Sequence, residues 1–250
     1  MKVFRPASTG RLQEAAAGRP SENKNVKGKG NSSITGRKQS LEEKKTVHKE
    51  NEIDTVIFDI GGVLVELGRF RFLEKKGFTG ELAQRVMYAT MRSDDWVQLD
   101  LNNISEEDIL QRFIENDPSI EKEIRHMFAD VHGIVEPKQT SLPWIRRIKA
   151  SGRRVLFLSN YSHKIMRECA DSLYFLPEMD GGLFSCDVHM VKPDQAFYQL
   201  LIDKYDLNPA KSVFIDDLEA NLEPARALGI RTILFRSQDQ AEQDLARLLG

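Results

Sequence analysis

Segment 55–64 reads TVIFDIGGVL and constrains the fold of this chain more than any other segment. Its apolar, partly β-branched residues at 56–58 have the composition of a strand that is covered on both faces. Gly61 and Gly62 then allow a sharp turn where a side chain would obstruct close approach. In a parallel α/β sheet, ligands bind at the carboxyl ends of the strands, so Asp59 is predicted to lie at a ligand site. Taken alone, the motif is equally consistent with a polar turn after a strand.

Three later segments favour the ligand site over the polar turn. Residues 155–158 (VLFL) and 213–215 (VFI) are further strands of the buried type, and each is followed directly by polar side chains. Between them, a lysine precedes a proline that can open a helix predicted over 195–205. The chain therefore presents, in order, a carboxylate, a hydroxyl with an amide, a cation and an acid pair. These residues are Asp59, Ser159, Asn160, Lys192, Asp216 and Asp217.

Each later motif also has a simpler interpretation. Lys192 alone is typical of a solvated lysine before a helix. Asp216 and Asp217 suit a helix N-cap with a neighbouring acid, a role compatible with a site. Asn221 either orients that acid pair or is a surface amide. The ordered combination of the motifs favours a shared site.

The four motifs resemble those of the haloacid dehalogenase-like hydrolase superfamily. The resemblance covers residues 53–236 and is carried by FDIGGVL, SN, VKPD and FIDDLEAN. These motifs are similar to the branch that contains sugar-phosphate phosphatases and the phosphatase half of mammalian soluble epoxide hydrolase. A dehalogenase is the less favoured alternative, because by resemblance those enzymes work without metal and do not need the acid pair with the Gly-Gly turn.

The resemblance implies attack by Asp59 on a phosphomonoester to form an aspartyl-phosphate, which divides one difficult displacement into two easier ones. Fixed donors and a divalent cation offset the repulsion between carboxylate and phosphate, and hard oxygen ligands with several waters suit Mg²⁺. The implied metal ligands are Asp59, the carbonyl of Gly61, Asp216 and Asp217. The implied phosphate-binding groups are Ser159, Asn160, Lys192 and the amides of Gly61 and Gly62, with Asp59, Ser159 and Lys192 as the catalytic residues.

Gly61 departs from the pattern of the family. Phosphatases of the family usually carry a second aspartate at this position, which acts as general acid and base. Such help is typically worth about 10² to 10⁴ in rate. The group that activates water is therefore unassigned, and neither His163 nor Glu66 is assigned to this role. A non-catalytic or very slow phosphate-binding protein is the alternative hypothesis.

The domain organisation is predicted from the helical pattern. Apolar residues at three-to-four spacing indicate helices over 81–91, 105–115 and 120–131. We expect residues 67–137 to form a small cap and residues 52–66 and 138–250 to form an α/β core. Alternation of strands and helices predicts a doubly wound, Rossmann-like parallel sheet with a last strand over 231–235 and a terminal helix over 241–249. Trp96 is interpreted as cap core rather than as a substrate platform.

Residues 1–51 differ in composition from the rest of the chain. The first 50 residues contain 12 Lys and Arg against 5 Asp and Glu, whereas the remaining 200 contain 24 against 33. This predicts a disordered basic tail, and a solvated extension is favoured over a nucleic-acid contact. The tail lacks the apolar core of a secretory signal, no span approaches 18 consecutive apolar residues, and a cytoplasmic protein is expected. Cys169 and Cys186 are predicted to be reduced structural thiols.

The functional hypothesis from the sequence is a Mg²⁺-dependent phosphatase that acts on a small phosphorylated metabolite such as a sugar phosphate.

Overall fold

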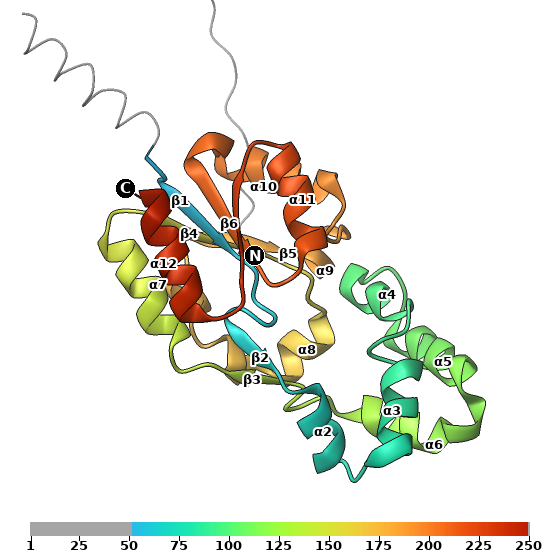
Figure 1. Cartoon of the computed structure of the whole chain (residues 1–250). Coiled ribbons are helices and arrows are strands. Elements are labelled where there is room, and N and C mark those ends of the chain that lie inside the picture. The colour runs from blue at the N-terminus through green and yellow to red at the C-terminus, as the bar shows by residue number, and fades with distance from the viewer. Residues whose placement is uncertain (1–51, 250) are drawn as a thin grey trace, which may run out of the picture. The chain divides into compact units, whose positions relative to one another are not determined.

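The computed structural model describes residues 52–249, which lie in one compact unit. A five-stranded parallel sheet has the order β5-β4-β1-β6-β7 (Figure 1). Its strands are β1 (Thr55–Phe58), β4 (Arg154–Ser159), β5 (Gly181–Phe184), β6 (Ser212–Asp216) and β7 (Arg231–Leu234). The prediction of a parallel α/β sheet is confirmed. The predicted basic tail, residues 1–51, lies outside the described residues.

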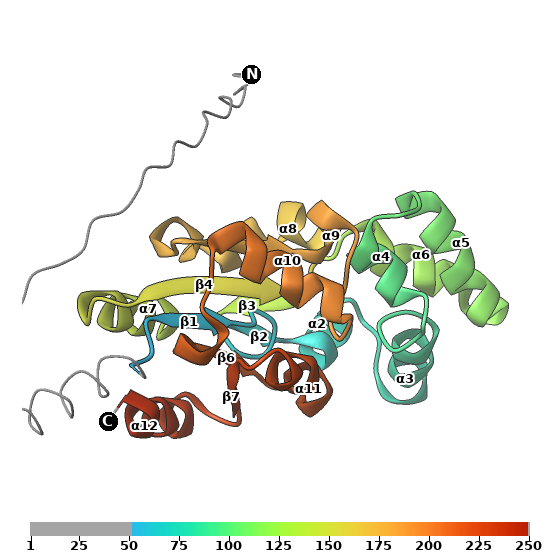
Figure 2. The ribbon, with the colours of Figure 1, turned by 90° about the horizontal axis from the view of Figure 1, so that it is seen from above.

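The sheet is covered on both faces, which explains why its inner strands are apolar throughout. On one face, Val56 and Phe58 of β1 pack in a cluster with Trp144. On the other face, Ile57 packs in a cluster with Phe197. The first cluster includes residues of α7 (Ser141–Ala150) and α12 (Gln238–Leu249), and the second includes residues of α10 (Gln195–Tyr205) and α11 (Glu219–Ala227). Figure 1 shows α7 and α12 on one side of the strands and α10 and α11 on the other, and Figure 2 shows the same elements from above.

A helical segment follows β2 (Val65–Leu67) and ends at β3 (Val135–Pro137), and these two strands pair antiparallel in a separate two-stranded sheet. Its helices pack around Phe113, Ile124 and Phe128, and these residues belong to the same apolar cluster as the β1 face with Phe58. The helices are α2 (Arg69–Lys75), α3 (Gly80–Ala89), α4 (Trp96–Leu101), α5 (Glu106–Asn116) and α6 (Glu121–Ala129).

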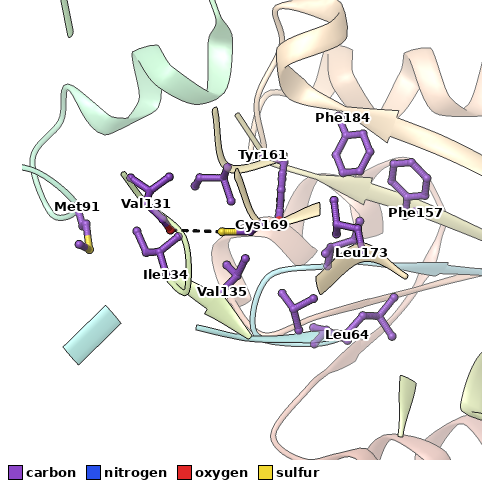
Figure 3. Packing of buried hydrophobic residues seen from close by; sticks show 14 of the residues in the cluster. Leu64, Met91, Val131, Ile134, Val135, Phe157, Tyr161, Cys169, Leu173 and Phe184 are labelled. Atoms are coloured by element: carbon purple, nitrogen blue, oxygen red, sulfur yellow. Dashed lines mark hydrogen bonds between the residues drawn. The ribbon is translucent and has the colours of Figure 1, made fainter. Parts of the chain in front are cut away.

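One helix of the segment begins at a cap that the sequence carries, and the end of the segment is tied to the core. The Ser105 hydroxyl accepts a hydrogen bond from the Asp108 amide at 3.1 Å and caps α5. Where the segment returns to the sheet, the Cys169 thiol donates to the carbonyl of Val131 at 3.3 Å (Figure 3). Figure 3 also shows Val135, Tyr161 and other apolar side chains filling this junction, so the two parts share one core.

Several elements differ from the sequence predictions. The amphipathic pattern of residues 162–173 predicts one helix, but α8 covers only His163–Glu168 and is followed by a 3-10 turn at Ala170–Leu173. The strand β5 was not predicted because it opens with two glycines, which have low strand propensity. A Cβ on Gly182 would lie 2.4 Å from the ring of Phe157, so close packing against β4 requires glycine there.

Within residues 52–249, no helix is long and apolar enough to cross a membrane.

Candidate active site

The strand register brings the polar residues of three motifs to one edge of the sheet. Phe58 at the end of β1 is aligned with Phe157 of β4 and with Ile215 of β6. The Asp59 amide continues the ladder by donating to the carbonyl of Ile215 at 2.9 Å. Since the strands are parallel, the residues that follow them emerge at the same carboxyl edge.

The two oxygens of the Asp59 carboxylate have different surroundings. Oδ1 accepts hydrogen bonds from the Ser159 hydroxyl and the Ile60 amide, both at 2.7 Å, and lies 2.8 Å from Lys192 Nζ. Within the described part of the chain, Oδ2 receives no hydrogen bond. Asp59 lines a cavity, and 9% of its side chain is exposed. The contacts on Oδ1 fix the carboxylate and leave Oδ2 as its unengaged oxygen.

Lys192 is a buried ion-pair partner and not a solvated lysine. Its Nζ lies 2.8 Å from Asp59 Oδ1 and 2.7 Å from Asp216 Oδ2, and only 1% of its side chain is exposed. Burial lowers the pKa of this ammonium, but the neighbouring Asp59 and Asp216 more than offset this and leave the pKa above its usual value. Lys192 is therefore a fixed positive charge between two carboxylates.

Asn160 holds the Lys192 loop in place. Its Oδ1 accepts from the Lys192 amide at 2.8 Å, and its Nδ2 donates to the Lys192 carbonyl at 3.0 Å. The sequence predicts a phosphate contact for Asn160, which also lines the cavity, but its observed hydrogen bonds go to the backbone. Its role in the structure is to position the lysine.

Asp216 is oriented from the helix that follows β6. Asn221 Nδ2 lies 3.0 and 3.2 Å from the two oxygens of Asp216, and the Leu218 amide donates to Oδ1 at 2.8 Å. The carbonyl of Asn221 in turn accepts from the Tyr198 hydroxyl at 2.7 Å. Of the two interpretations of Asn221, the structure supports the one in which it orients the acid pair.

Three carboxylates gather beside the glycine turn. Single oxygens of Asp59, Asp216 and Asp217 all lie within 4.8 Å of one another. Gly62 has φ +77°, and a Cβ at this position would lie 2.4 Å from Asp217 Oδ2. The turn therefore needs glycine both for its backbone conformation and for the space that Asp217 occupies.

Asp59 and Asp217 of this cluster have raised pKa values. Burial raises the pKa of Asp59 to about 6, with Lys192 opposing the shift and Asp216 adding to it. Burial and then the charge of Asp216 raise the pKa of Asp217. Burying carboxyl groups together disfavours their charged form. Such clusters are typical of sites that bind a cation or catalyse a reaction.

The site opens into a cavity of about 480 Å³. Asp59, Gly61 and Lys192 line the cavity from the side of the sheet. Trp96 and Asp100 of α4 line it from the helical segment. Trp96 is stacked on Phe113 at 6.0 Å between ring centroids, so it packs in the segment and also lines the cavity. The other lining residues are Leu67, Arg69, Ile134, Val135, Asn160, Tyr161, Ile165, Pro193, Asp217, Leu218 and Asn221.

Sequence reasoning missed Arg69, Asp100 and Tyr161. Asp100 lies one helical turn after Trp96, and Tyr161 directly follows the Ser-Asn pair. Both positions can be read from the sequence, but neither residue directly follows a predicted strand, which is the signal that identified most of the other site residues. His163 and Glu66, which were left unassigned, are not among the lining residues; His163 Nε2 lies 2.9 Å from Asp187 Oδ1, and Glu66 is exposed in β2.

The family of the chain follows from comparison with known proteins. The model of the haloacid dehalogenase-like hydrolases matches residues 53–229, and the chain belongs to this family. The predicted resemblance is thereby confirmed.

Several known proteins are similar in sequence to parts of this chain. Bifunctional epoxide hydrolase 2 of Sus scrofa is 40% identical over 74 residues, which are 30% of this chain and 13% of that protein. Acyl-CoA dehydrogenase family member 10 of Mus musculus is 29% identical over 207 residues, which are 78% of this chain and 19% of that protein. The chain thus spans less than a fifth of the length of these two relatives. Sesquiterpene phosphatase astK of Aspergillus oryzae is 23% identical over 78% of this chain and 95% of its own length.

Solved structures show the same fold. A family enzyme from Bacteroides thetaiotaomicron, crystallised with magnesium and inorganic phosphate, superposes with a TM-score of 0.55 at 18% identity, covering 74% of this chain and 96% of that one. A family hydrolase from Porphyromonas gingivalis gives a TM-score of 0.59 at 20% identity, covering 79% and 98%.

Proposed function

We propose that this hydrolase is a Mg²⁺-dependent phosphatase of small phosphorylated metabolites. The observation that carries the proposal is the Asp59 carboxylate, with one oxygen held by three donors and the other unengaged beside a cavity. This is the arrangement that a carboxylate nucleophile needs. The phosphatase astK and the phosphate complex of the Bacteroides enzyme support the same class of substrate.

The residues beside Asp59 fit a magnesium ion. Oxygens of Asp59, Asp216 and Asp217 lie within 4.8 Å of one another, and hard oxygen donors are what Mg²⁺ prefers. We propose these three carboxylates and the Gly61 carbonyl as the metal ligands. When bound, Mg²⁺ would neutralise part of the charge on the carboxylates and on the substrate phosphate.

The side chains of the site have distinct tasks in the proposed reaction. Asp59 Oδ2 attacks the phosphorus and forms an aspartyl-phosphate, while the donors on Oδ1 hold the carboxylate in line. Lys192 keeps its positive charge beside the incoming phosphate. The amides of Gly61 and Gly62 supply hydrogen bonds to the transferred group, and the Ser159 hydroxyl would have to release Asp59 Oδ1 in order to donate to that group as well.

The cavity supports a small substrate. We propose that residues 67–137 act as a cap over the core formed by 52–66 and 138–250, because Trp96 and Asp100 of this segment line the same cavity as Asp59. A volume of about 480 Å³ is of the size that holds a metabolite. A cap of this kind excludes water from the reacting groups.

Phosphate release from a panel of phosphomonoesters tests the proposal. We expect turnover with Mg²⁺, loss of turnover with a chelator and loss in Asp59→Ala. Phosphate binding without turnover of any ester would favour the alternative hypothesis of a phosphate-binding protein. That hypothesis rests on Gly61, which stands where phosphatases of the family usually have an aspartate.

Substitution of Gly62 is expected to weaken Mg²⁺ binding. In Gly62→Ala the added methyl group meets the Asp217 carboxylate and displaces a proposed metal ligand. We expect the dissociation constant for Mg²⁺ to rise by about tenfold or more. Loss of a group that orients a metal ligand typically weakens metal binding by such a factor. Titration calorimetry with MgCl₂ measures the change.

Gly77→Ala is the matched control for this substitution. Gly77 also has positive φ, +83°, but nothing lies within 4 Å of an added Cβ. Both variants carry similar backbone strain, of about 1–2 kcal/mol. Equal Mg²⁺ affinity in the two variants would refute the assignment of Asp217 as a ligand.

A further inference from the structure

The proposed reaction needs a proton donor for the leaving group, and Gly61 provides none. Among the described residues that line the cavity, the carboxyl groups are Asp59, Asp100 and Asp217. Asp59 is the proposed nucleophile, and Asp217 belongs to the proposed metal site. Asp100 is the remaining acid, and it comes from the helical segment instead of the strand ends.

The backbone of Asp100 is fastened to the core. The Ser185 hydroxyl donates to the carbonyl of Asp100 at 2.7 Å, and His189 Nδ1 lies 2.8 Å from the carbonyl of Leu101. Asn102 then ends α4 in the left-handed conformation, with φ 52°. A backbone held this way keeps Asp100 at a defined position in the cavity wall, as general acid-base catalysis requires.

The surroundings of the Asp100 carboxyl favour its protonated form. Burial raises its pKa to about 7, Arg69 and Lys192 oppose the shift, and Asp59 adds to it. Tyr161 and Cys186 also face its charge, and burial raises the pKa of both, so they are neutral at pH 7. A carboxyl group that titrates near neutrality can both give and take a proton.

We propose that Asp100 is the general acid and base of this enzyme, supplied by the helical segment in place of the missing core aspartate. The proposal rests on the proposed phosphatase function. In the first step, Asp59 Oδ2 bonds to phosphorus, the bond from phosphorus to the leaving oxygen breaks, and Asp100 gives its proton to that oxygen. In the second step, Asp100 takes a proton from water as the water oxygen bonds to phosphorus. The bond from Asp59 to phosphorus then breaks, and phosphate leaves.

The Tyr161 hydroxyl gives independent support for a polar ligand group in this cavity. Tyr161 is 3% exposed and lines the cavity, and its hydroxyl has no hydrogen-bond partner among the described residues. A buried hydroxyl without a partner is costly. A leaving oxygen bound near Asp100 would supply the missing partner.

The experiment compares two esters whose leaving groups differ in their need for a proton. Loss of a general acid slows an alkyl ester, whose alkoxide leaves poorly, and spares 4-nitrophenyl phosphate, whose phenolate leaves readily. In Asp100→Asn we expect kcat/KM for a simple alkyl phosphate to fall by about 10²-fold or more, with a fall of less than about tenfold for the aryl ester. The parameter kcat/KM is used because it reports the first chemical step even if the second becomes limiting.

Asp94→Asn is the control, because Asp94 is an exposed acid of the same segment and does not line the cavity. It should leave kcat/KM unchanged for both esters. Native thermal unfolding and retained binding of Mg²⁺ with inorganic phosphate show that Asp100→Asn is folded. An equal fall for both esters would make Asp100 a structural residue and overturn the proposal, as would no fall for either ester. A native protein that hydrolyses neither ester would remove the proposed function and this proposal with it.

The pH profile provides a second readout. For the alkyl ester, kcat/KM of the native protein should decline above pH about 7, where Asp100 loses its proton. This decline should be absent in Asp100→Asn. A decline of the same size in the variant would assign it to another group and overturn the proposal.

Discussion

Replacement of Asp59 by asparagine is expected to abolish phosphate release while the site still binds phosphate. The amide has the shape of the carboxylate but cannot attack phosphorus, so kcat should fall by at least about 10⁴-fold, as for other covalent nucleophiles. Inorganic phosphate should bind as tightly as before or more tightly, because the repulsion between carboxylate and phosphate is removed. Phosphate-release assays and titration calorimetry measure the two quantities.

Asp54→Asn is the control for this prediction, because Asp54 is an exposed acid that lies just before β1. It should retain full activity. If Asp59→Asn kept more than about one hundredth of the native kcat, Asp59 would not be the nucleophile, since general electrostatic or acid-base roles account for losses of that smaller size.

Replacement of Lys192 by methionine is expected to destabilise the fold strongly at pH 8. The variant leaves Asp59 and Asp216 buried without the cation that lies 2.8 and 2.7 Å from them. Removal of one partner from a buried ion pair typically costs about 3–5 kcal/mol of unfolding free energy. Denaturant unfolding measures the loss, and Lys204→Met, at an exposed position in α10, is the control.

The loss of stability in Lys192→Met should depend on pH and on Mg²⁺. Lys192 opposes the raised pKa of Asp59, so without the lysine this acid holds its proton more tightly in the folded state than in the unfolded one. The folded state therefore binds more protons, and the stability of the variant falls as pH rises from about 4 to 8. Added Mg²⁺ should stabilise the variant more than the native protein. A loss that is the same at pH 5 and pH 8, with and without Mg²⁺, would mean that Lys192 matters for packing rather than for charge.

The strand-end motifs were predictable because local sequence controls them. The runs at 56–58 and 213–215 form β1 and β6, and each acid lies at the carboxyl end of its own strand, so Asp59 and Asp216 meet once the parallel strands pair. The Gly-Gly turn was also readable, since its φ of +77° at Gly62 is a conformation that glycine adopts at little cost.

The cavity wall was not predictable from the same signals. Arg69 and Asp100 line the cavity only because the helical segment packs back over the strand ends. The carbonyl of Asp100 is bonded to Ser185, 85 residues away, and that of Leu101 is bonded to His189, 88 residues away. The secondary-structure propensity of a segment does not predict such tertiary contacts. The contact of Asn160 with the Lys192 backbone was not foreseen for a similar reason, because the two residues lie 32 positions apart in the chain.

The most direct test of the account is the mass of the Asp59 peptide after acid quenching during turnover. With Mg²⁺ and an ester that is hydrolysed, the peptide should gain the mass of one phosphoryl group. The modification should be absent in Asp59→Asn, and it should accumulate in Asp100→Asn, which lacks the base for the second step. Steady hydrolysis with an unmodified Asp59 peptide in both the native protein and Asp100→Asn would contradict nucleophilic attack by Asp59.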